Sequence, residues 1–229
     1  MKYLELIWAA LFRRKARTLL TLLSIMVAFL LFGPLETVRS TFSNFGQSTA
    51  GHDRLLVMSK TRPGAPLPIS LYARLKNVPG IANIDYAYIF RSTYRDPKNA
   101  IAVETHTETF FDLYPELEVS PSARLALHRT RTGAIAGEVL AQKFDWQVGD
   151  KIPLQTSVTR KDGSTTWTFD LVGIYRFTDP GMKVWDNMMY INWDYFDEAR
   201  QSESGTVGWY VIKVANPAEI DAVAQAVDA

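Results

Sequence analysis

The chain contains no cysteine among its 229 residues. This absence excludes a disulfide framework, thiolate zinc sites and a cysteine nucleophile. Histidine is also scarce, because only His52, His106 and His128 are present and they lie far apart in the sequence. An excess of charge of one sign is missing too, since the formal net charge is +1. A nucleic-acid binder should carry a marked basic excess, so nucleic acid is not an expected partner.

Sequence motifs for phosphate chemistry and acyl transfer are absent as well. No G-x-x-x-x-G-K-[ST] loop occurs, and the segment GAIAG at 133–137 lacks the lysine and the hydroxyl of such a loop. We interpret it as a small-residue strand packed under a helix. No G-x-S-x-G elbow is present. The sequence therefore predicts no catalytic residue, no cofactor site and no ATP hydrolysis by this chain alone.

One short pattern could offer metal ligands. Glu104, His106 and Glu108 alternate, so on a strand they would share one face. A membrane-anchored enzyme with its site on this face is one hypothesis. The interpretation we favour is a solvated strand face, because no second cluster of ligand residues occurs. No metal site is therefore predicted.

The longest apolar run extends from residue 18 to residue 35 and carries no charge. Its length nearly matches the thickness of a hydrocarbon core, so it predicts one transmembrane helix over 18–35. The basic residues before it indicate that the N-terminus is cytoplasmic; they are Arg13, Arg14, Lys15 and Arg17. Residues 1–17 are expected to form an interfacial helix plus this basic cluster. A cleaved signal peptide is the alternative, and the long aromatic N-terminal region disfavours it.

The rest of the chain is predicted to form a stalk over 36–52 and an outer domain over 53–229. Strands and helices are interleaved, which predicts an α+β (mixed α/β) domain in two lobes on the far side of the membrane. A strand is expected over 81–94, another over 100–106 after a turn at Asp96-Pro97, and a hairpin around residues 161–163. Ser70 and Asn216 are expected to cap helices.

Aromatic residues provide the remaining candidate site. Trp167 and Phe169 alternate along one predicted strand, a pattern that usually indicates core. The loop from 180 to 185 differs, because it places Met182 and Trp185 beside a Pro-Gly turn. We expect both side chains to be exposed and to contact a partner or an apolar ligand.

Three segments together resemble the N-terminal half of an ABC-transporter permease subunit of the MacB/FtsX-like type. The run RRKARTLLTLLSIMVAFLLFG resembles the start of that family's first membrane helix, and LYARLKNVPGIANIDY its helix and following strand. The most specific similarity covers GAIAGEVLAQKFDWQVGDKIPL and FDLVGIYRF. The residues that match the family pattern there are Gly137, Ala141, Gly149, Asp150, Ile152, Val172, Gly173 and Ile174.

The resemblance implies a membrane protein of the bacterial inner membrane with a MacB-like periplasmic core domain. Such a permease has four membrane helices and works as a dimer with two cytoplasmic ATPase subunits. ATP would bind to a separate chain and drive motion of the periplasmic domain, for export or for lipoprotein or peptide handling. The implied partners are that ATPase, a second permease subunit of the same or a different sequence, a periplasmic adaptor and membrane lipid. Three C-terminal membrane helices of the family are not found in these 229 residues, so a fragment or a truncated product is expected. A membrane-tethered periplasmic binding or adaptor module without an ATPase is the alternative.

Overall fold

The structure is a computed structural model that describes Ala16 and residues 18–27, 29–30, 53–60, 62 and 64–228. The chain divides into two compact units, residues 1–47 and 48–229. In the first unit, the described residues between 18 and 30 are helical. The predicted stalk and, apart from Ala16, the predicted interfacial segment lie outside the described residues.

Six strands of the second unit close into a ring. Each strand pairs with the next in the order β3, β4, β9, β6, β8 and β7, and β7 pairs back onto β3. The pairs β4–β9 and β6–β8 are parallel, and the other four pairs are antiparallel. The strands are β3 (Ile81–Tyr94), β4 (Asp96–His106), β6 (Gly133–Gly137), β7 (Lys151–Thr156), β8 (Thr166–Phe177) and β9 (Met188–Asn192).

Alternating side chains from all six strands fill the interior of this ring. Phe90, Val103, Leu154, Trp167 and Met189 belong to one buried cluster, and none of them is more than 4% exposed. Helices α6 (Glu138–Phe144) and α7 (Trp193–Ala199) add further residues to the cluster. Successive side chains in these strands therefore point alternately into the ring and away from it, which explains why apolar residues recur at every second position. The prediction that Trp167 and Phe169 are core residues is confirmed, since both are 0% exposed.

Part of the outer face of the ring is covered by short helices. They contribute Phe110, Leu127 and Met182 to a second buried cluster, which also contains Ile135 and Tyr190 from the strands. Helix α5 packs against β6, β8 and β9, while η1 packs against β6, β8 and α6. The covering elements are α4 (Phe110–Leu113), β5 (Leu117–Glu118), α5 (Pro121–Arg129) and the 3-10 helix η1 (Pro180–Asn187).

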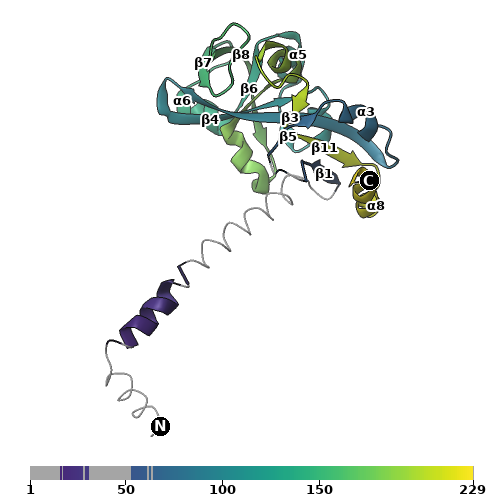
Figure 1. Ribbon diagram of the computed structural model, residues 1–229. Helices are drawn as coiled ribbons and strands as arrows, with labels where there is room; N and C mark the ends of the chain where they lie inside the picture. Colours follow the sequence, from purple (N-terminus) through teal and green to yellow (C-terminus); the bar gives the residue numbers. More distant parts are fainter. Residues whose placement is uncertain are drawn as a thin grey trace. The chain divides into compact units, whose positions relative to one another are not determined.

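The N-terminal half of β3 continues beyond the ring into a three-stranded extension, in the order β1, β11, β3. Figure 1 shows β3 and β4 running across the domain, with α3 and α8 near β1 and β11. A third buried cluster here contains Ile84, Tyr210 and Ile212. The elements of this part are β1 (Arg54–Val57), β2 (Leu67–Pro68), α3 (Leu71–Leu75), β10 (Thr206–Val207), β11 (Trp209–Val214), η2 (Pro217–Glu219) and α8 (Ile220–Asp228).

Most local predictions agree with the structure. The strand over 81–94 is confirmed, as are the β7–β8 hairpin and the cap at Asn216, whose side chain accepts from the Ala218 amide. Ser70 makes no side-chain cap bond, because it already has helical backbone angles, so that prediction was wrong. The predicted turn at Asp96-Pro97 was also misplaced. The reversal occurs at Arg95, which has φ +61° and lies between the paired Tyr94 and Asp96.

The predicted α+β class is confirmed by this arrangement of helices around a mixed sheet. The division into two lobes stays a prediction.

Candidate functional site

The segment predicted to contact a partner forms η1, and its side chains do not point as expected. Asp179 begins the helix, and its side chain accepts a hydrogen bond from the Gly181 amide at 2.7 Å. Met182 is only 3% exposed and packs in the second buried cluster. The expectation that Met182 is exposed was therefore wrong. Trp185 is half-buried and packs against the same cluster.

Hydrogen bonds hold η1 in a fixed position on the strands. The carboxylate of Asp186, 1% exposed, accepts from the Phe177 amide at 2.7 Å and pairs with Lys183 at 3.2 Å. The Tyr175 hydroxyl donates to the Trp185 carbonyl at 2.7 Å. Because these contacts join the C-terminal end of η1 to β8, and Met182 is anchored in the buried cluster, the segment is firmly attached and suited to present a surface.

The most exposed apolar side chain of η1 is Val184, which the sequence did not single out. Val184 is 71% exposed, more than any other large apolar side chain among the described residues of the second unit. The neighbouring elements α6 and β8 also carry exposed aliphatic side chains, Val139 at 48% and Ile174 at 37%. The 3-10 geometry turns Met182 inward and Val184 outward. Residues 180–187 show no clear helical or strand periodicity, so the sequence did not predict which of these side chains is buried.

A cluster of charged side chains lies buried where β4 meets α4. The imidazole of His106 contacts Asp85 from β3 through Nδ1 at 2.7 Å and Glu104 through Nε2 at 3.3 Å. Asp85 also accepts from the Thr107 amide at 3.1 Å and from its hydroxyl at 2.7 Å. Phe110 stacks on the imidazole with 3.6 Å between ring centroids. The cluster thus connects two strands to the start of α4.

The carboxylates of Glu104 and Asp85 determine the protonation state of His106. Burial alone would lower the pKa of this imidazole, but Glu104 and Asp85 outweigh burial and raise the pKa to about 9. His106 is therefore protonated at neutral pH and forms an ionic contact with both acids. His128 differs, because burial lowers its pKa and Glu108 only partly opposes that effect.

The predicted solvated face of Glu104, His106 and Glu108 was wrong. Glu104 and His106 are 4% and 3% exposed, and Phe110 of α4 stacks on the imidazole. The strand ends at His106, so Glu108 leaves this face and approaches His128 at 4.0 Å. Within the part of the chain that the structure describes, no three potential ligands are grouped to hold a metal ion. Asp85, which sequence reasoning missed, comes from another strand, and no local pattern connects it to His106.

The first unit carries an exposed apolar helix. Leu19, Leu23, Met26 and Phe29 are between 56% and 75% exposed, and the Ser24 hydroxyl bonds back to the Leu20 carbonyl at 2.9 Å. In the described ranges, no helix reaches both the length and the apolar character needed to span a membrane. The residues expected to set membrane orientation, Arg13, Arg14, Lys15 and Arg17, lie outside those ranges.

Comparison with solved structures identifies two domains of the same fold. The extracellular domain of the noncanonic ABC-type transporter YknZ from Gram-positive bacteria aligns with a TM-score of 0.51 at 12% identity, over 75% of this chain and 87% of that one. The periplasmic region of MacB from Actinobacillus actinomycetemcomitans aligns with a TM-score of 0.56 at 9% identity, over 78% and 81% of the two chains. At such identities the likeness establishes the fold alone.

No curated protein sequence matches this chain. The sequence model described as MacB-like periplasmic core domain matches residues 18–229, which is nearly the whole chain. The chain belongs to the family of MacB-like periplasmic core domains of ABC-transporter permeases.

Proposed function

We propose that this chain is the N-terminal part of a permease subunit of an ABC transporter. The observation that carries the proposal is the family match, which begins at residue 18 and so includes the apolar helix together with the folded domain. In this proposal residues 18–35 cross the bacterial inner membrane once, with 1–17 in the cytoplasm. Residues 36–52 form a stalk, and residues 53–229 form the periplasmic domain.

The exposed apolar helix supports the membrane anchor. Consecutive leucine, isoleucine and methionine side chains of its described residues are each about half exposed or more, so apolar groups lie on all sides of this helix. A contiguous exposed apolar surface of this kind is stable only against an apolar surrounding, and membrane lipid supplies one. The basic residues Arg13, Arg14, Lys15 and Arg17 would then hold the N-terminus at the inner surface.

The permease would couple ATP hydrolysis on a separate cytoplasmic subunit to motion of the periplasmic domain. A closed ring of strands with three buried clusters can be displaced as one rigid body, because packed interiors deform little. Export and lipoprotein or peptide handling are the transport roles that such motion would serve. A second permease subunit, of the same or a different sequence, completes the proposed complex.

The surface around η1 is the proposed contact with a periplasmic adaptor or substrate. Val184, Val139 and Ile174 supply exposed aliphatic groups there, and the half-buried Trp185 lies at the base of the same segment. Exposed apolar side chains that lie together on a folded surface mark sites of contact with other proteins. Met182 would act from beneath by holding the segment in place.

Purification of the protein from native membranes tests this function. We expect a tag on the chromosomal gene to recover a second polypeptide that carries an ABC ATPase sequence, because the proposed complex requires one. The recovered sample should hydrolyse ATP, whereas this chain alone carries no phosphate-binding loop. The measurement is mass spectrometry of the purified sample together with its ATPase rate.

An unrelated single-span membrane protein with the same tag is the control, and it should recover no ATPase. Recovery of the tagged chain without any ATPase polypeptide, in a detergent that preserves other ABC transporters of the same cell, would contradict the proposal. That result would favour a membrane-tethered binding module instead.

A further inference from the structure

A buried arginine lies where the chain enters the folded domain. Arg54 is the first residue of β1 and is only 3% exposed. Its Nη2 donates to Oε1 of Glu116 at 2.8 Å, and its Nη1 donates to Oε2 of the same carboxylate at 3.0 Å. Nη1 also donates to the Leu113 carbonyl at 2.6 Å, and the guanidinium lies 4.5 Å from the centroid of the Tyr114 ring. Arg54 therefore attaches the start of β1 to the segment 113–118.

The contact between Arg54 and Glu116 is ionic. Burial alone would raise the pKa of the Glu116 carboxyl, but the hydrogen bonds from Arg54 are the largest of several effects that lower it, and the net shift of the pKa is downward. The carboxylate is therefore charged at neutral pH. Two parallel N–H···O bonds hold the guanidinium and the carboxylate in one relative orientation, because both groups are planar. The segment 113–118 thus has a defined position relative to β1.

The same segment is attached to the strand that leads into η1. The Thr178 amide and the Thr178 hydroxyl both donate to the Glu116 carbonyl, at 2.8 and 3.1 Å. Next to this contact, β5 pairs with the end of β8. Glu116 therefore binds Arg54 through its side chain and Thr178 through its main chain.

A further contact extends this connection into η1. Phe177, the neighbour of Thr178, donates its amide hydrogen to the Asp186 carboxylate at 2.7 Å. Asp186 belongs to η1 and is 1% exposed. A continuous series of contacts therefore leads from Arg54 through Glu116 to the end of β8, and from there to the segment that presents the exposed aliphatic surface.

Apart from Arg54, the start of β1 is held by the pairing of a short edge strand. β1 has four residues and pairs with β11 on one side, and among the described residues no strand pairs with its other side. The ends of such a strand open easily, because few main-chain bonds hold each residue. The side chain of Arg54 therefore determines how closely the start of β1 follows the rest of the domain.

We propose that Arg54 is a positioning residue that makes the entry of the chain and the η1 surface move together, because both are fixed to the segment 113–118. A displacement of the stalk would then also shift η1, where the proposed partner contact lies. The inference rests on the proposed function only in treating residues 36–52 as a stalk. The contacts belong to the domain itself and would connect the same two places in a tethered binding module.

Hydrogen exchange of the full chain in detergent tests this connection from both ends. Arg54→Met removes the ionic contact, and we expect exchange in 180–187 to become about tenfold faster, as for the loss of a hydrogen bond to a charged group. Thr178→Val removes one hydroxyl bond on the η1 side, and we expect exchange in 54–57 to become about threefold faster. Effects in both directions are required of coupled sites. An arginine that only held β1 in place would leave exchange in 180–187 unchanged.

Two controls separate this coupling from a general loss of stability. Leu154 lies inside the ring and belongs to none of these contacts, so Leu154→Ala should lower the stability but leave early exchange in 180–187 unchanged. Adding Glu116→Gln to Arg54→Met should not speed exchange further, because both substitutions break the same pair.

Unchanged exchange in 180–187 in Arg54→Met would overturn the proposal, as would unchanged exchange in 54–57 in Thr178→Val or additive effects in the double variant. None of these measurements involves an ATPase. Their failure is therefore distinct from failure of the proposed function, which recovery of the ATPase polypeptide tests separately.

Discussion

Replacing Asp85 by alanine is expected to lower the free energy of unfolding by about 3–5 kcal/mol, the usual cost of removing one partner from a buried ionic contact. Asp85 is 0% exposed and accepts from the Thr107 amide and hydroxyl as well as contacting His106. The substitution would leave the imidazolium with Glu104 alone and would leave the Thr107 amide without an acceptor. Urea denaturation of the full chain, followed by circular dichroism, measures the change.

The pH dependence of the wild-type protein provides a second measurement of this cluster. The pKa of His106 is raised from 6.5 to about 9 in the folded state, so the folded state retains a proton that the unfolded state loses. The stabilisation is fully present below pH 6.5 and is lost as the pH rises through 9. We expect a loss of about 3 kcal/mol over this interval, and a smaller loss in Asp85→Ala because one carboxylate remains.

Asp228→Ala is the matched control for the loss of a carboxylate. Asp228 pairs with Lys60 at 3.5 Å, and both side chains are strongly exposed, so this substitution should change the free energy of unfolding by less than about 0.5 kcal/mol. Equal effects of Asp85→Ala and Asp228→Ala, together with stability that does not change between pH 6.5 and pH 9, would contradict the ionic cluster.

Replacing Gly137 by alanine is expected to destabilise the domain by about 3 kcal/mol or more. Gly137 is the last residue of β6, and a Cβ at this position would overlap the backbone carbonyl of Asp186 in η1. The overlapping atoms belong to the Asp186 backbone, which cannot rotate away from the new Cβ as a flexible side chain could. Either η1 must leave its place on β8, or the β6–α6 junction must move. Urea denaturation measures the loss, and increased proteolysis within 180–187 would report displacement of η1.

Gly181→Ala, within η1 itself, is the matched control. An added Cβ there meets only the Asp179 side chain at 3.3 Å, so the cost should stay below about 1 kcal/mol. Full stability of Gly137→Ala would contradict the close approach of β6 and η1. It would also remove the physical reason for a glycine at this position.

Much of the fold could be predicted because its patterns are local. The alternation in 81–94 marks one strand in a single continuous segment, and it became β3 with the same bounds. The small residues of GAIAG predicted a buried strand that leads into a helix, and all five residues of β6 are buried. Asn216 predicted a helix start because its side chain reaches an amide only two residues away.

The features that were missed depend on contacts between distant segments. Asp85 and His106 are 21 residues apart and meet only because β3 and β4 pair, so the buried charge of His106 has no local signature. Closure of the ring needs β7 to reach β3, which the hairpin pattern alone does not predict. Met182 was expected on the surface because a Pro-Gly turn precedes it. Its burial is set by the cluster beneath η1.

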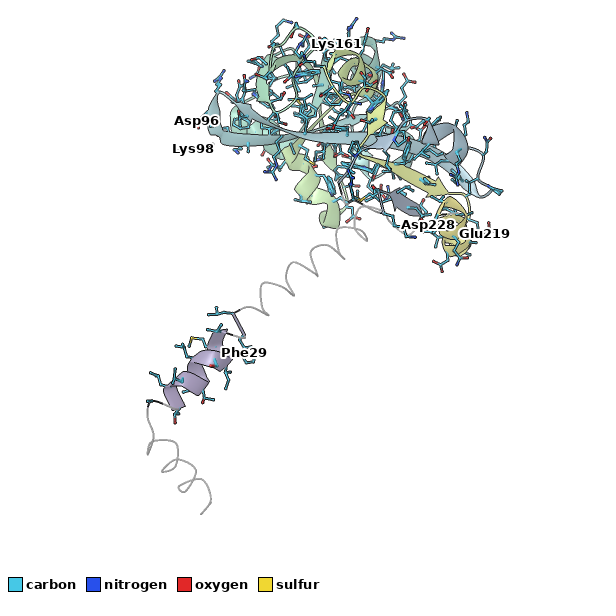
Figure 2. The ribbon with its side chains drawn as sticks, viewed as in Figure 1. Phe29, Asp96, Lys98, Lys161, Glu219 and Asp228 are labelled. Atoms are coloured by element: carbon cyan, nitrogen blue, oxygen red, sulfur yellow. The ribbon has the colours of Figure 1, made fainter. Side chains whose placement is uncertain are left out.

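Labelling of two single-cysteine variants tests most directly the proposal that the domain lies outside the membrane on an N-terminal anchor. The chain has no cysteine of its own, so Lys2→Cys and Lys161→Cys each create one unique site. Lys161 is exposed in the turn between β7 and β8, at the surface of the domain (Figure 2). With a membrane-impermeant maleimide, we expect Lys161→Cys to react in intact spheroplasts and Lys2→Cys to react only after permeabilisation. Protection of Lys161→Cys in intact spheroplasts, or loss of residue 2 from the mature protein, would contradict the proposed anchor and its direction.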